Sequence, residues 1–138
     1  AVFESTHEMF FPLNPTINMT FGEKFNSNKK KLLEEILPNS LNNFEKLLQN
    51  SSGNFFIGND PFYCDFNAYH HFSMCLILDK NIFSNFPNLK IFINNFEKLN
   101  NIKNYLDGRP DLVELGKSPH FLIDGKKIPT GLNPNKKY

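Results

Sequence analysis

Residues 55–78, FFIGNDPFYCDFNAYHHFSMCLIL, decide how this chain folds. The stretch opens with a short apolar run and a turn, and from Phe62 to Leu78 it is apolar on nearly every side of a helical wheel. A helix without a polar face is one that other elements surround. The sequence therefore predicts a buried central helix against which the rest of the chain packs.

Amphipathic helices are predicted on both sides of this centre. Apolar residues recur every three to four positions over residues 29–50, where Pro38 should introduce a kink, and again over residues 87–99. A short helix follows over residues 102–106. Together with an N-terminal helix, these segments predict an all-α bundle of about five helices.

The N-terminal helix is predicted over residues 2–11. It should break or kink at Pro12 and Pro15, because proline lacks an amide hydrogen and clashes with the preceding turn. Residues 22–28 are predicted to form a loop.

The chain changes character after the helices. Residues 121–128 hold two short apolar stretches around Asp124-Gly125, a dipeptide typical of tight hairpin turns. We therefore divide the chain into a helical domain over residues 1–109 and an irregular tail over residues 110–138, with a small hairpin packed on the domain. The tail either covers the mouth of a cleft or is mobile, and residues 136–138 are expected to form a loose end.

Composition excludes two classes of partner. The net charge is +1, with 15 basic and 14 acidic residues, and the one lysine cluster, at residues 29–31, precedes Glu34 and Glu35. That pattern indicates a solvated helix face rather than a nucleic-acid surface. Apolar runs also stay below the roughly 18 residues of a membrane span.

Cysteine and histidine spacing argues against a metal site or a disulfide. Cys64 and Cys75 lie eleven residues apart on one predicted helix, or about 16 Å at the helical rise, which is too far for a disulfide. His70 and His71 have no acidic or cysteine partners at ligand spacing. We expect two buried thiols in a reducing, cytoplasmic compartment, and no bound metal. Because the chain begins at Ala1 inside an apolar-patterned stretch, we also expect it to be part of a longer protein.

Two motifs resemble the C-terminal domain of glutathione transferases, especially the mu and sigma classes and similar protozoan enzymes. The first is residues 55–66, where an apolar pair precedes Gly-Asn and a helix-capping box that ends in Asp65. The second is FPNL at residues 86–89, followed by FEKL at 96–99 and IKNYL at 102–106. The resemblance covers residues 1–109.

Asp65 is predicted to be a folding residue. In a capping box, the cap side chain accepts a backbone hydrogen bond and the acid three residues later returns one to the cap amide. Phe62 occupies the cap position and has no side-chain oxygen, so half of the box is missing, at a cost of about 1 kcal/mol.

The resemblance implies that the two domains of such an enzyme have different roles. A thioredoxin-like N-terminal domain would bind glutathione, the co-substrate, and activate its thiol, so this chain would hold no catalytic residue and would be inactive alone. The helical domain would supply the apolar wall for small electrophiles and part of a homodimer interface. The conjugation reaction would serve detoxification.

Three residues are the candidates for these roles. Glu8 is the best match for the acid that reaches glutathione's amino group across the dimer, although the family usually has Asp there; the alternative is an ordinary exposed helix glutamate. Phe11 is expected to line the electrophile site or to pack in the core. Phe21 falls at a second-substrate position only in an alignment that contains a gap.

Two further functions remain open. The same helical domain occurs as a non-catalytic docking module in translation factors and synthetase complexes, and the Phe-rich sequence would suit association. A free-standing helical domain with a ligand pocket and no glutathione is the third alternative.

Overall fold

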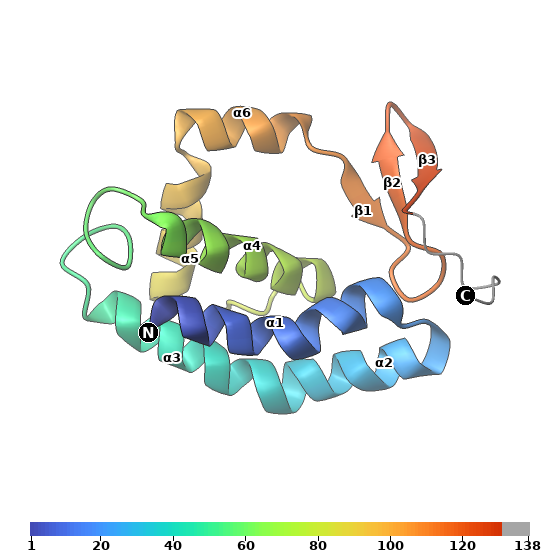
Figure 1. Ribbon diagram of the computed structural model, residues 1–138, viewed down its shortest axis with the longest axis horizontal. Helices are drawn as coiled ribbons and strands as arrows, with labels where there is room; N and C mark the ends of the chain where they lie inside the picture. Colours follow the sequence, from blue (N-terminus) through green and yellow to red (C-terminus); the bar gives the residue numbers. More distant parts are fainter. Residues whose placement is uncertain (131–138) are drawn as a thin grey trace.

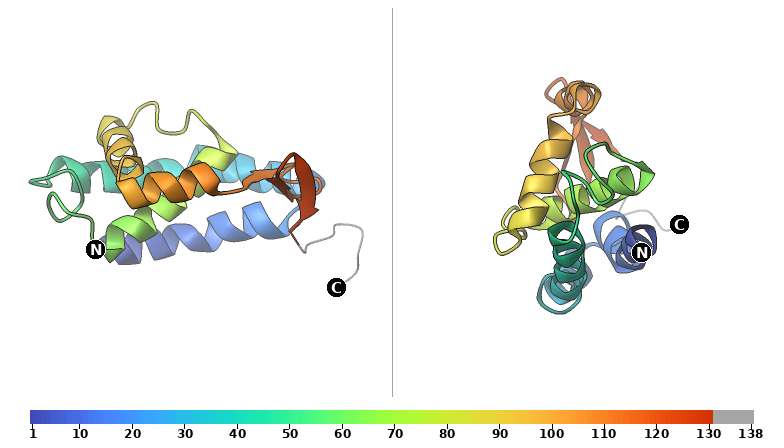
Figure 2. Two further views of the ribbon diagram at one scale, coloured as in Figure 1. Left: turned by 90° about the horizontal axis from the view of Figure 1, so that it is seen from above. Right: turned by 90° about the vertical axis from the view of Figure 1, so that its left-hand side faces the viewer.

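The structure, a computed structural model, describes residues 1–130. At its centre lies α4 (Tyr63–Leu78), the helix that the sequence predicts to be buried. α1 (Val2–Met19) packs along one side of α4, while α3 (Leu37–Gln49) and α5 (Pro87–Glu97) lie on other sides of it (Figures 1 and 2). α6 (Asn100–Gly108) leads from α5 to the C-terminal part.

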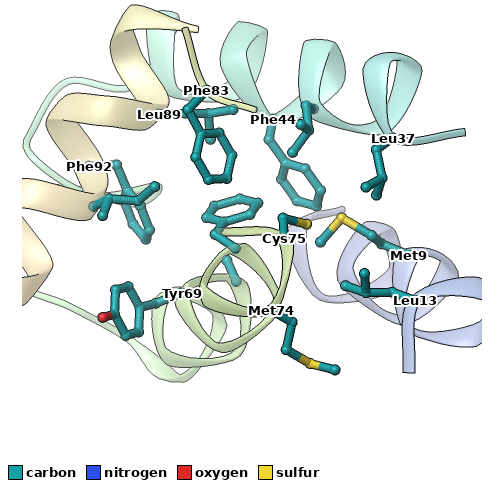
Figure 3. Packing of buried hydrophobic residues seen from close by; sticks show 14 of the residues in the cluster. Met9, Leu13, Leu37, Phe44, Tyr69, Met74, Cys75, Phe83, Leu89 and Phe92 are labelled. Carbon is teal, nitrogen blue, oxygen red and sulfur yellow. The ribbon is translucent and has the colours of Figure 1, made fainter. Parts of the chain in front are cut away.

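Aromatic rings fill the centre of the core. Phe72 of α4 meets Phe44 of α3 and Phe92 of α5 nearly edge-on, with ring centroids 5.2 and 5.8 Å away. Figure 3 shows Phe44 and Phe92 in this cluster, with Met9 and Leu13 of α1 on the side of Phe44 that is away from Phe92. Such aromatic pairs add about 0.5–1.5 kcal/mol each beyond the burial of their area. The four helices therefore share one hydrophobic core.

Asp65 organises the start of α4 and the loop before it. Its side chain is fully buried; Oδ2 accepts the amide of Phe62 at 2.8 Å, and Oδ1 accepts the amide of Phe56 at 3.0 Å. The amide of Asp65 donates in turn to the Phe62 carbonyl at 2.9 Å. The backbone thus provides the acceptor that the Phe62 side chain lacks.

Glu45 joins α3 to the first turn of α5. One carboxylate oxygen accepts the amide of Asn88 and the other accepts the amide of Leu89, each at 2.9 Å. These amides have no partner within their own helix, and a carboxylate at that end also complements the helix dipole. The two helices are therefore held in a defined relative position.

α1 runs through both of its prolines, so the predicted break does not occur. Pro12 and Pro15 leave the carbonyls of Glu8 and Phe11 without their usual amide donors, but both of those residues are exposed to solvent. An interior proline costs about 3 kcal/mol, whereas burying a large apolar side chain contributes about 1.5–3 kcal/mol. Tertiary packing of the opposite face offsets the loss; its buried residues are Thr6, Met9, Leu13, Thr16 and Ile17.

Residues 22–28 are helical, and their prediction as a loop is wrong. They belong to α2 (Gly22–Lys31), whose only buried side chain is Phe25. α2 continues through a π-helical turn, η1 (Leu32–Ile36), into α3, and the amide of Leu37 donates to the carbonyl of Leu32 five residues earlier. The predicted irregularity near Pro38 therefore takes the form of a widened turn just before it.

The C-terminal part forms an antiparallel sheet in the order β1 (Asp111–Val113), β2 (His120–Ile123), β3 (Lys126–Pro129). The fold is thus mostly helical and not strictly all-α, and residues 110–130 are not an irregular tail. β2 and β3 are the hairpin predicted around Asp124-Gly125, where both residues have positive φ, as a tight turn requires. The loose end predicted at residues 136–138 lies outside the described residues.

Gly116 attaches the sheet to the helices. Its φ is +76°, its carbonyl accepts the amide of Gly22 at 2.7 Å, and a Cβ at this position would lie 2.2 Å from the Phe25 ring. Only glycine allows the loop to approach α2 so closely. Within residues 1–130, none of the helices combines the length and hydropathy that crossing a membrane requires.

Candidate functional site

A cleft of about 630 Å³ opens between the C-terminal half of α1, the side of α4, the end of α6 and the sheet. Phe121 and Ile123 alternate along β2 and so lie on one face of the sheet, and Leu112 pairs with Phe121 in register. The apolar wall is made by Ile17, Met74, Ile77, Leu112, Phe121 and Ile123. The cleft therefore depends on the sheet as well as on the helices.

Polar side chains line the rest of the cleft. On α1, the Asn18 amide donates to the Asn14 side-chain oxygen at 2.8 Å. On α4, partial burial, with smaller effects from His71 and the Arg109 guanidinium, lowers the pKa of His70. The imidazole of His70 is therefore neutral at pH 7 and can donate one hydrogen bond and accept another.

A smaller hollow of about 170 Å³ lies beside the cleft, between α4, α5 and α6. Four residues line both spaces and mark the place where they meet; we call them the polar junction. They are His70, Ser73, Tyr105 and Arg109.

The residues predicted for the site lie outside the cleft. Phe11 is 64% exposed on α1, edge-on to His7 at 5.0 Å, and lies one turn before Asn14 on the same side of the helix. Glu8 is exposed on α1, and Phe21 is half-buried at the start of α2. The structure does not bring these three side chains together.

Exposed aromatic side chains gather beside the starts of α1 and α4. Phe3 and Tyr63 are 46% and 72% exposed, and their rings lie 5.8 Å apart. Phe11 lies eight residues, or about 12 Å, further along α1 and contacts His7 instead. We call Phe3 and Tyr63 the aromatic patch. Exposed aromatic residues in such an arrangement are typical of a surface that another domain or chain covers.

Sequence reasoning did not select the cleft residues. Arg109 was noticeable as the only arginine in the chain, yet its neighbours suggested only the end of a helix. His70 and Tyr105 lie on different helices, and no local spacing links them. Across residues 1–130, no group of three or more histidine, cysteine or acidic side chains is placed to hold a metal ion.

Comparison with known proteins shows the class of domain to which these helices belong. Residues 7–109 match the family model described as "Glutathione S-transferase, C-terminal domain". The chain belongs to this family, so the resemblance seen in its two motifs is confirmed.

The curated relatives are themselves glutathione transferases. The chain is 34% identical to a glutathione S-transferase of Plasmodium yoelii yoelii over 89 residues, a stretch that covers 64% of this chain and 43% of that protein. It is 32% identical over 81 residues to glutathione S-transferase P 10 of Caenorhabditis elegans, covering 59% of this chain and 39% of that protein. Glutathione S-transferase Mu 4 of Homo sapiens is 32% identical over 93 residues, 67% of this chain and 41% of that protein. The chain thus spans about two-fifths of the length of these relatives.

Solved structures share the fold. The pi-class glutathione S-transferase of Onchocerca volvulus has a TM-score of 0.68 at 24% identity, covering 77% of this chain and 50% of that one. Rat hPGDS in complex with a quinoline has a TM-score of 0.69 at 19% identity, covering 80% and 54%.

Proposed function

We propose that this chain is the C-terminal helical domain of a glutathione transferase, in which it supplies the apolar wall for the electrophile and part of a dimer interface. The observation that carries the proposal is the cleft, whose apolar wall combines side chains of two helices and two strands in a member of this family. The expected reaction joins glutathione to small apolar electrophiles, in the cytoplasm and for detoxification.

The chain's own thiols are poorly suited to the nucleophilic step. Burial raises the pKa of Cys75 to about 12 and, with the neighbouring Asp65 carboxylate, also raises that of Cys64. A nucleophilic cysteine instead needs a lowered pKa, because the thiolate is the reactive form. The proposed nucleophile is therefore the glutathione thiol, activated by residues that this chain does not contain.

The aromatic patch supports a covering partner for the domain. Phe3 and Tyr63 lie on the first turns of α1 and α4 and are both exposed to solvent. In the proposed enzyme, a glutathione-binding domain covers this face, and Glu8 reaches the glutathione amino group across the dimer. Phe11, one turn before the cleft residue Asn14, then borders the electrophile, and Phe21 lies beyond the far end of α1.

The proposal is tested on the natural gene product by retention on glutathione-agarose and by conjugation of 1-chloro-2,4-dinitrobenzene. Ile77→Asp places a carboxylate in the apolar wall and should lower kcat/KM for the electrophile by about tenfold, with little change in the KM for glutathione. Ile91→Asp is the matched control, since Ile91 is also an exposed helical isoleucine but lies outside the cleft.

A non-catalytic docking module is the second candidate, and the aromatic patch is the observation that favours it. If the natural gene product is neither retained on glutathione-agarose nor able to conjugate the electrophile, the transferase proposal fails and the docking module stands. Equal losses in Ile77→Asp and Ile91→Asp would instead refute the assignment of the cleft as the electrophile site.

A further inference from the structure

The polar junction places hydrogen-bond donors beside the apolar wall of the cleft. The Arg109 guanidinium, the Tyr105 hydroxyl and the neutral imidazole of His70 can each donate, while the Ser73 hydroxyl already donates to the His70 carbonyl at 2.7 Å. Among the ion pairs formed within residues 1–130, none involves Arg109. The junction therefore carries a positive charge whose guanidinium is available to a ligand.

Asp111 is the one acidic side chain that lines the cleft within the described residues. It lines the cleft but not the adjoining hollow, whereas Arg109 lines both. The Arg109 charge acts on His70 and Tyr69 of α4, and at Tyr69 the Glu97 carboxylate, which lines neither space, acts in the opposite sense and more strongly. Within the described residues, Arg109 is therefore the one side chain with a full charge that lines both the cleft and the hollow.

We propose that the polar junction binds the carboxylate of an amphipathic ligand whose apolar body lies in the cleft, and that Arg109 makes the site prefer acidic over neutral electrophiles. The preference among electrophiles rests on the proposed transferase function, whereas the binding of the acid does not.

The chemistry of the junction suits a carboxylate. A guanidinium presents two parallel N–H groups that match the two carboxylate oxygens, and this geometry is stronger than a single neutral hydrogen bond. Tyr105, one turn before Arg109 on α6, and His70 across on α4 can add a donor each. A cleft of about 630 Å³ lies within the usual range for small-molecule sites and can hold the apolar body of such a ligand.

The test compares two probes that differ only in charge. Binding of 11-(dansylamino)undecanoic acid and of its primary amide is measured by dansyl fluorescence on the natural gene product, on Arg109→Gln and on Lys98→Gln. Lys98 is a control because it is an exposed lysine outside the cleft and the hollow. We expect Arg109→Gln to weaken binding of the acid by about tenfold or more and that of the amide by less than about twofold, with Lys98→Gln unchanged.

Binding of the amide probe also reports on folding, because a misfolded variant would bind neither probe. Equal binding of acid and amide by the unmodified protein would overturn the proposal, as would an equal loss of both probes in a folded Arg109→Gln variant, or no binding of either. If the acid preference depends on Arg109 but the protein conjugates nothing to glutathione, only the transferase function fails. If conjugation occurs without that preference, only the role of the junction fails.

Discussion

Replacing Asp65 should reveal how much of the fold depends on one buried carboxylate. The side chain accepts two backbone amide bonds, at 2.8 Å from Phe62 and 3.0 Å from Phe56, and has no exposed surface. A hydrogen bond to a charged group contributes about 1.5–3 kcal/mol. Asp65→Ala loses both bonds and should therefore lower the free energy of unfolding by about 3–6 kcal/mol.

This loss of unfolding free energy corresponds to a lower melting temperature. A chain of 138 residues has an unfolding entropy of roughly 0.3 kcal/mol/K, so Asp65→Ala should melt about 10–20 °C below the unmodified chain. Asp65→Asn keeps the shape but turns an amide group toward one of the two backbone donors. It should lose one bond and melt about 5–10 °C lower.

The assay is thermal and urea unfolding followed by circular dichroism at 222 nm. Asp60→Asn is the matched control, because Asp60 is an exposed acid in the same segment and should change stability by less than about 0.5 kcal/mol. If Asp65→Asn were as stable as Asp60→Asn, the carboxylate would not hold the loop to α4, and the reasoning would be refuted.

Two further perturbations test the attachment of the sheet and the burial of an imidazole. Gly116→Ala adds a Cβ 2.2 Å from the Phe25 ring at a position with positive φ, and should speed amide hydrogen exchange in residues 111–130, as measured by mass spectrometry. The control is Gly125→Ala, where φ is also positive but no atom lies within 4 Å of the added Cβ, and its effect should be much smaller. Equal effects would mean that the contact with Phe25 does not hold the sheet. Burial lowers the pKa of His71 below its ordinary 6.5, despite its bond to the Asn67 carbonyl, so the unfolded chain binds more protons and stability should fall as the pH drops below about 6.5. His71→Phe should reduce this loss between pH 7.5 and 5.5 in urea titrations, leaving the contribution of His70, whose pKa burial also lowers. An unchanged slope would show that His71 is not the group responsible.

Local patterns were sufficient for three of the four helices that form the core. The apolar run of residues 62–78 predicts α4, and the periodicities over residues 29–50 and 87–99 predict α3 and α5, because each helix buries a face that repeats within one or two turns. The Asp124-Gly125 dipeptide likewise predicts the β2–β3 turn, since positive φ is a property of the residues themselves.

Elements whose stability comes from distant partners were not predictable in the same way. α1 stays helical through two prolines because its buried face packs on α4. α2 forms from a polar sequence whose only buried side chain is Phe25. β1 has only three residues and acquires its partner, β2, across an intervening loop. In each case a long-range contact outweighs the local preference.

The sequence by itself determined the family, through its two motifs, and the buried helix that organises the domain, because both are encoded in neighbouring residues. The tertiary structure alone decided where the cleft lies. The polar junction takes His70 from α4 and Arg109 from the end of α6, and the cleft wall takes Phe121 from the sheet. Such a site has no signature in spacing along the chain, because its residues become neighbours only when separate elements pack.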